Sequence, residues 1–161
     1  MQRLVSRLKS RKGFTLVELA VVIVIIGVLA AFGVPKFLAS VEKSKATEAF
    51  NFWSAVQAAE ERYIAQNGVY IAVTDPTAAA SSSGNPLDIM LPTLQYFSFT
   101  SLTPTASTAG SPSWEGILTR NGNSSYQYTV QWNQNGFDSA STIMTYPAIC
   151  PVTYSTTGSG S

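Results

Sequence analysis

The residue whose position most strongly implies chemistry is Glu18, a lone carboxylate near the start of a long apolar run. Placing an ionised acidic side chain in a membrane interior costs about 2.5–3.5 kcal/mol, so such a residue is expected to be functional and to need a positive partner. No Lys or Arg occurs between Gly13 and Lys36. One candidate partner is a new amino terminus on a neighbouring copy of the protein, made by cutting the chain just before Phe14.

Most other site chemistries are excluded by composition. The 161 residues include no histidine and one cysteine, Cys150, which rules out histidine-dependent catalysis, histidine-ligated metals, a four-cysteine zinc site and an internal disulfide. The S-x-x-K spacing at residues 40–43 lacks the partner motifs of serine–lysine acyl enzymes. The scattered acids of the C-terminal region form no dense oxygen cluster for calcium. We therefore predict no enzyme activity, no cofactor and no metal site, and a buried thiol at Cys150.

The elements that position Glu18 are a basic arm and an apolar helix. Residues 1–13 hold five of the ten basic residues and no acid, whereas residues 14–34 are apolar apart from Thr15 and Glu18. Twenty-one helical residues rise about 31 Å, close to the roughly 30 Å hydrocarbon core of a bilayer. The positive-inside tendency then keeps the N-terminus cytoplasmic. A cleaved secretory signal peptide is the rival interpretation, but its apolar region seldom tolerates a carboxylate.

The pattern after the apolar run predicts that the helix continues to about residue 65. Residues with apolar side chains recur at spacings of three and four and predict one buried face: Ala49, Trp53, Val56, Ala59 and Tyr63. Asn67-Gly68 is the expected stop signal. Residues 36–65 also carry four basic and four acidic side chains. We predict that these charges lie on the exposed face, where they either pack against other copies or simply solvate the helix.

Residues 66–161 are expected to form a small antiparallel sheet after a connecting loop at 69–95. The predicted strands are residues 96–102, residues 125–133 and a weaker one at 141–149. In the second of these, Tyr126, Tyr128, Val130 and Trp132 alternate with polar residues and should face the helix. The region holds only five charged residues against 15 Ser and 14 Thr, so we expect hydroxyl groups, and not charges, to hydrate its surface. The predicted class is α+β, with three or four strands packed on one long helix.

Gly13 followed by FTLVELAVVIVIIGVLAAFGVPKF resembles the class III signal of type IV pilins and of the pseudopilins of type II secretion. The resemblance implies a pilin fold, in which a long N-terminal helix, kinked near Pro35, packs on a small antiparallel sheet. It also implies that a prepilin peptidase cuts between Gly13 and Phe14 and methylates the new amine of Phe14. Glu18 would attract that amine on an adjacent subunit during assembly.

The resemblance also implies an assembly role for residues in the middle of the predicted helix. Gly27 and Pro35 belong to the matched pattern, and a proline inside a helix lacks an N–H and clashes with the preceding turn. We predict that residues 27–35 tend to lose helix within a filament; the alternative is a simple proline kink. Cys150 departs from the pattern of many type IV pilins, because a single cysteine cannot form their C-terminal disulfide.

The resulting prediction is a structural subunit of a type IV pilus with three regions: a leader at residues 1–13, a helix at 14–65 whose 14–37 half spans the membrane and assembles, and a head at 66–161. The expected partners are further copies in a helical filament, a prepilin peptidase, an inner-membrane assembly platform and, before assembly, membrane lipid. No nucleic acid is expected to bind directly, because the chain from Phe14 onward has nine acids against five bases. The precursor would lie in the inner membrane and the filament at the cell surface.

Two alternative functions fit the same sequence. Within the family, the chain is a pseudopilin of type II secretion or of DNA-uptake machinery. From another class, it is a monomeric binding domain tethered to the membrane, for which Glu18→Ala would leave function unchanged.

Overall fold

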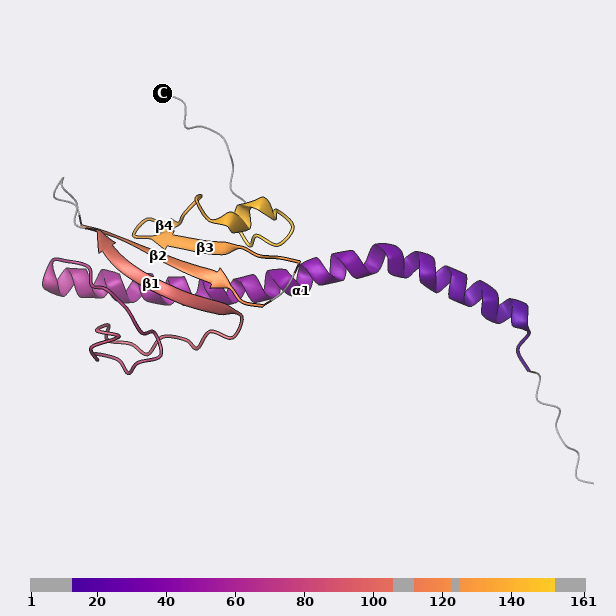
Figure 1. Ribbon diagram of the computed structural model, residues 1–161, viewed down its shortest axis with the longest axis horizontal. Coiled ribbons are helices and arrows are strands. Elements are labelled where there is room, and N and C mark those ends of the chain that lie inside the picture. Colours follow the sequence, from indigo (N-terminus) through magenta and orange to yellow (C-terminus); the bar gives the residue numbers. More distant parts are fainter. Residues whose placement is uncertain (1–12, 106–111, 123–124, 153–161) are drawn as a thin grey trace, which may run out of the picture. The chain divides into compact units, whose positions relative to one another are not determined.

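The computed structural model describes residues 13–105, 112–122 and 125–152. It forms two compact units, residues 1–38 and residues 39–161, and each is described by itself. The helix α1 (Leu16–Asn67) is followed by four strands and one short 3-10 helix (Figure 1). These are β1 (Phe97–Thr105), β2 (Ser113–Arg120), β3 (Thr129–Asn133), β4 (Gly136–Phe137) and η1 (Thr142–Thr145). The predicted α+β class is confirmed, whereas most of the predicted leader lies outside the described residues.

Helix α1 begins and ends two residues later than predicted and is uninterrupted through Gly27 and Pro35. The kink expected at Pro35 and the loss of helix in a filament remain predictions. The stop signal is confirmed, because Gly68 adopts a φ of +77° and its N–H donates to the carbonyl of Ile64 at 2.7 Å. This is the single hydrogen bond of a left-handed helix cap.

The four strands form one antiparallel sheet in the order β1-β2-β3-β4. The predicted strands at 96–102 and 125–133 appear as β1 and as the shorter β3. Strand β2, a central strand of the sheet, was not predicted. Its buried positions alternate as Trp114, Gly116 and Leu118, so a glycine occupies the middle of the inward face and interrupts the apolar alternation that marks a strand.

Gly116 is required where it stands because the indole of Trp53 on α1 covers it. A Cβ added at Gly116 would lie 2.1 Å from Cη2 of Trp53. The same indole donates through Nε1 to the carbonyl of Val130 on β3 at 3.2 Å. Trp53 therefore fixes the distance between helix and sheet and joins α1 to two strands.

The predicted third strand at 141–149 is wrong. That segment contains η1, and its hydroxyl groups serve the outer edge of β3 instead of a backbone ladder. Ser141 Oγ accepts from the N–H of Gln131 at 2.8 Å and donates to its carbonyl at 3.2 Å. Thr142 Oγ1 accepts from the N–H of Thr129 at 2.7 Å. Side-chain hydroxyls thus satisfy strand groups that the adjacent two-residue β4 does not reach.

The core lies between α1 and the inner face of the sheet, as predicted. Ala49, Trp53, Val56 and Ala59 are fully buried, and Tyr63 is half-buried. From the sheet side, Val130 and Trp132 of β3 and Tyr128 just before it are buried, whereas the predicted Tyr126 is half-buried. Rings pack against one another across this layer, including Trp53 with Trp114 at a centroid distance of 6.0 Å. These aromatic side chains are therefore core residues.

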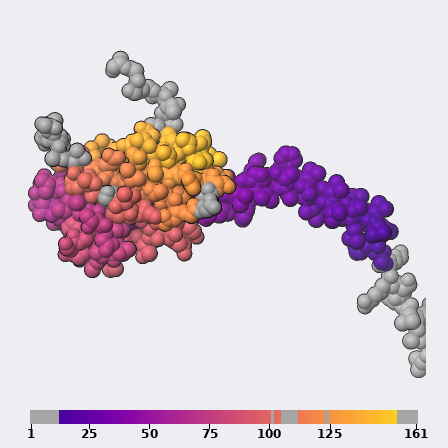
Figure 2. All heavy atoms as spheres, viewed as in Figure 1, coloured from indigo at the N-terminus to yellow at the C-terminus, as the bar shows by residue number. Residues whose placement is uncertain are grey.

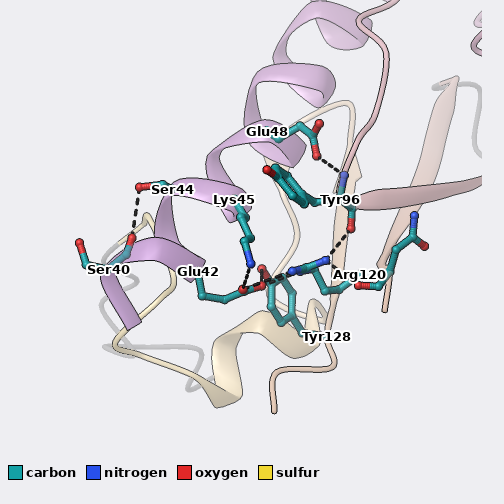
Figure 3. Close-up of polar contacts among 9 residues, drawn as sticks. Ser40, Glu42, Ser44, Lys45, Glu48, Tyr96, Arg120 and Tyr128 are labelled. Carbon is teal, nitrogen blue, oxygen red and sulfur yellow. Dashed lines mark hydrogen bonds and ion pairs between the residues drawn. The ribbon is translucent and has the colours of Figure 1, made fainter. Parts of the chain in front are cut away.

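Two acids of α1 that were expected on the exposed face are buried. Glu42 is 3% exposed and Glu60 is fully buried. Glu42 meets Arg120 from the end of β2, with Nε–Oε1 at 2.5 Å, and accepts from the hydroxyl of Tyr128 at 3.1 Å (Figure 3). The prediction failed because both partners are distant in sequence. Among the described residues, no cation forms an ion pair with Glu60.

Candidate assembly and processing site

The chain just before α1 is non-helical, and Thr15 is the residue that starts the helix. Its Oγ1 accepts from the backbone N–H of Glu18 at 3.2 Å, and Glu18 Oε2 accepts from the backbone N–H of Thr15 at 2.8 Å. These reciprocal bonds form a capping box, in which two otherwise unpaired N–H groups at a helix start are satisfied. The T-x-x-E spacing of residues 15–18 is the signal that predicts this arrangement.

The capping box also orients the Glu18 carboxylate. Oε2 accepts a second bond, from the Thr15 hydroxyl at 2.8 Å, whereas Oε1 accepts none from the described residues. One oxygen is therefore fixed by the protein's own chain and the other is open to an external cation. The carboxylate lies three residues from Thr15 and four from Phe14, the position at which a new amino terminus was predicted.

An unbroken apolar surface follows Glu18. Every residue from 13 to 38 is exposed, including Phe14 at 82% and Leu16 at 87% (Figure 2). Exposed apolar areas of this extent mark protein or membrane contact sites. Helix α1 contains a stretch near the N-terminus that is long and apolar enough to cross a membrane. Exposure of this apolar surface to water is unfavourable, so a membrane or another protein chain is expected to cover it.

The other predicted assembly residues lie farther along the same surface and do not contact Glu18. Gly27 has no neighbouring atom within 4 Å of a Cβ built on it, so no contact within the described chain requires a glycine there. Pro35 lies inside the helix and leaves the carbonyl of Ala31 without its usual donor. A missing side chain on an exposed apolar helix permits close approach of a second helix.

A second polar arrangement joins the second half of α1, around residues 42–48, to the sheet (Figure 3). Lys45 Nζ lies 3.3 Å from Glu42 Oε2, beside the Arg120 contact. Burial alone raises the pKa of Glu42, but its hydrogen bonds and ion pairs with Arg120 and Lys45 outweigh that effect, so the pKa lies below 4.5. Six residues after Glu42, Glu48 accepts from the N–H groups of Gln95 and Tyr96 at 2.6 and 2.9 Å. These contacts hold the end of the connecting segment against α1.

The residues considered for other chemistry are not brought together. Cys150 is a free, buried thiol, as predicted. Among residues 13–105, 112–122 and 125–152, no group of three or more His, Cys, Asp or Glu side chains is arranged to hold a metal ion. Asp88 forms an exposed ion pair with Arg62 at 2.7 Å instead.

Comparison with known proteins finds similarity in the region that contains this site. Residues 8–34 match the family model described as the prokaryotic N-terminal methylation motif. That range includes Gly13, Phe14, Glu18 and Gly27, whereas Pro35 falls one residue beyond it.

Individual relatives fall into two groups. The chain is 44% identical over 60 residues to the fimbrial protein EcpC of Eikenella corrodens, covering 37% of this chain and 39% of the relative. It is 35% identical over 82 residues to the type IV major pilin protein PilA of Myxococcus xanthus, covering 50% and 37%. It is 38% identical over 65 residues to the type II secretion system core protein G of Vibrio cholerae, covering 40% and 44%. No solved structure matches the chain.

The predicted resemblance to type IV pilins and type II secretion pseudopilins is therefore confirmed. The alignments span about two fifths of the length of these curated relatives.

Proposed function

We propose that this chain is a structural subunit of a type IV pilus filament. It is made as an inner-membrane precursor, cut by a prepilin peptidase between Gly13 and Phe14, methylated on the new amine and polymerised through α1. The role is structural and not catalytic. The observation that carries the proposal is the exposed apolar surface of residues 14–38, which bears one carboxylate near its start.

Each part of the candidate site has a role in this assembly. Gly13 lacks a side chain and precedes the helix, so a peptidase can approach the bond to Phe14 closely. In the low-dielectric centre of a filament, the open oxygen of Glu18 attracts the Phe14 amine of an adjacent subunit more strongly than it would in water. A subunit in the wrong register leaves this carboxylate unpaired, which selects the correct one. Gly27 and Pro35 provide close helix contact and local freedom in the backbone.

The pseudopilin of type II secretion is a second candidate, favoured by the similarity to core protein G of Vibrio cholerae. The two functions share processing and assembly but differ in where the filament is found. A pilus extends from the cell surface, whereas a pseudopilus is short and periplasmic.

The deciding experiment is the intact mass and N-terminal sequence of the protein from sheared cell-surface material. A pilus subunit gives a chain that begins at Phe14 with a methylated amine. Processed protein found only in membrane fractions supports the pseudopilin function instead. A chain that still begins at Met1, or one cut near Ala31, contradicts both.

A further inference from the structure

Glu60 is a buried acid that the assembly mechanism does not use. It lies on the inner face of α1 and is fully buried. Its Oε2 accepts from the backbone N–H of Ile71 at 3.2 Å, whereas Oε1 is buried without a hydrogen-bond partner. A buried carboxylate with one donor is poorly compensated when it is ionised and far less costly when it is neutral.

Within the part of the chain that the structure describes, the groups that face Glu60 provide no positive charge. From its own helix comes Glu61, and from the segment that follows α1 comes Tyr70, whose hydroxyl donates to Glu61 Oε1 at 3.2 Å. The Tyr70 ring also contacts the ring of Trp114 on β2 at a centroid distance of 6.5 Å, and the buried Nε1 of Trp114 is itself unpartnered. Arg62 is exposed and paired with Asp88.

These surroundings favour the neutral acid. Burial raises the pKa of Glu60 to about 7; the hydrogen bond from Ile71 opposes this rise and the neighbouring charge of Glu61 adds to it. The carboxyl therefore changes charge near neutral pH, although an exposed glutamate changes charge near 4.5.

We propose that Glu60 is a proton-controlled latch that holds the start of the connecting segment, residues 70–73, against α1. In the neutral state the carboxyl stays buried and keeps its bond from Ile71. In the ionised state it needs more donors than this site offers, so water must enter or the segment must move away.

The segment that Glu60 holds, residues 70–73, also contacts the edge strand of the sheet. Val73 lies two residues beyond Ile71 and is fully buried. Its carbonyl accepts from the N–H of Leu102 at 3.1 Å, and the two residues form an antiparallel bridge along β1. Because β1 is an edge strand, release of residues 70–73 uncovers backbone groups that are able to pair with another chain.

The direction of the pH effect follows from the raised pKa. The folded state keeps the Glu60 proton to a higher pH than the open state does. The latch is therefore strongest below about pH 4.5, weakens as pH rises and has lost its full contribution once pH passes about 7.

The test is amide hydrogen exchange of the full chain in detergent micelles at pH 5.5 and 8.5, corrected for intrinsic exchange rates. In the wild type, the protection factors of residues 71–73 and Leu102 should fall by about 10- to 30-fold between the two conditions. Amides of Leu118 and Val130 in the sheet serve as the internal reference and should change by less than about twofold.

Glu60→Gln keeps the shape of the side chain but stays neutral, so this variant should show little pH dependence at residues 71–73. Glu61→Gln is the matched control: it removes an adjacent exposed acid whose charge contributes least to the raised pKa of Glu60, so it should retain most of the dependence. Equal pH dependence in the wild type and Glu60→Gln would overturn the proposal, as would its absence in the wild type. If Glu60→Gln loses protection at Leu118, carbon NMR titration of the wild-type carboxyls decides, and a Glu60 midpoint near 4.5 refutes the latch.

Discussion

Arg120 at the end of β2 donates through Nε to Oε1 of Glu42 on α1 at 2.5 Å, across 78 residues of sequence. Both side chains are buried, and the guanidinium also donates to the carbonyl of Tyr96 at 3.0 Å. The pair therefore joins three elements: the second half of α1, the end of the connecting segment and the central strand β2. An ion pair in this position is a point of high sensitivity, because neither charge has water to replace its partner.

Removing either partner of this pair should destabilise the head. We expect Glu42→Ala to lower the free energy of unfolding by about 3–5 kcal/mol, because the buried guanidinium of Arg120 loses its counter-charge. Arg120→Ala should cost somewhat less, because Lys45 still lies beside Glu42. The double variant should cost less than the sum of the two single variants. Urea unfolding of the full chain in micelles measures this through tryptophan fluorescence, since all three tryptophans are buried in the unit of residues 39–161.

The control is the ion pair between Arg62 and Asp88, whose side chains are 44% and 57% exposed. Arg62→Ala should cost no more than about 1 kcal/mol, because water replaces the lost contact. Comparable losses in Arg62→Ala and Arg120→Ala would mean that burial does not set the strength of the Glu42 pair.

The same pair predicts how stability responds to acid. Because the pKa of Glu42 is lowered in the folded state, its contribution is fully present above about pH 4.5 and is lost as pH falls through the folded pKa. Glu42→Gln should therefore flatten the acid side of the stability curve while lowering stability at pH 6. Urea midpoints from pH 6 to pH 3 provide the measurement. A wild-type curve as flat as that of the variant would contradict the assignment.

Gly116→Ala tests the contact between helix and sheet. A methyl group would lie 2.1 Å from Trp53, so the indole or the strand must move, and we expect a loss of about 1–3 kcal/mol or more. Glu115→Ala, on the outward face of the same strand, should have a small effect. Denaturant unfolding compares the two variants. Equal effects would show that strand propensity, and not the Trp53 contact, requires the glycine.

The sequence predicts those parts of the fold whose signals are local. The stripe on α1 repeats at helical spacing, and Asn67-Gly68 stops the helix at the expected place because Gly68 adopts a positive φ. Strand β2 was missed because Gly116, the small residue that Trp53 requires, removes an apolar residue from its inward face. The strand predicted at 141–149 is wrong. The hydroxyls of Ser141 and Thr142, and not a backbone ladder, bond to N–H groups of β3, and the sequence pattern does not distinguish the two.

The burial of charges was the other failure, and its cause is long-range contact. Glu42 is indistinguishable in sequence from its exposed neighbours until Arg120 is placed beside it. Glu60 lies seven residues after Trp53, a spacing that places both on one helix face, but its carboxylate led us to predict exposure. In the candidate site the structure forms a capping box from Thr15 and Glu18. The T-x-x-E spacing is a local signal for it, but our prediction for Glu18 rested on its charge alone.

Thr15→Ala tests the helix start. The variant loses the hydroxyl that caps the N–H of Glu18 and donates to Oε2, so the first turn should fray at a cost of about 1 kcal/mol. Amide exchange of Glu18 and Leu19 in micelles should then be about fivefold faster than in the wild type, because their N–H groups donate to Thr15. Thr15→Ser retains the hydroxyl and should restore slow exchange. If both variants exchange alike, the capping box does not hold the first turn.

Glu18→Gln separates the two roles of the carboxylate. A glutamine at this position still completes a capping box, so the helix start and the cut after Gly13 should be preserved. The charge that would attract a neighbouring Phe14 amine is removed, and we expect at least about a tenfold decrease in sheared filament relative to processed protein in the membrane. Glu18→Asp, which restores the charge on a shorter side chain, should recover part of this loss. Quantitative immunoblots of sheared and membrane fractions measure the ratio. Wild-type amounts of filament from Glu18→Gln would show that assembly depends on the shape of the capped helix start and not on its negative charge.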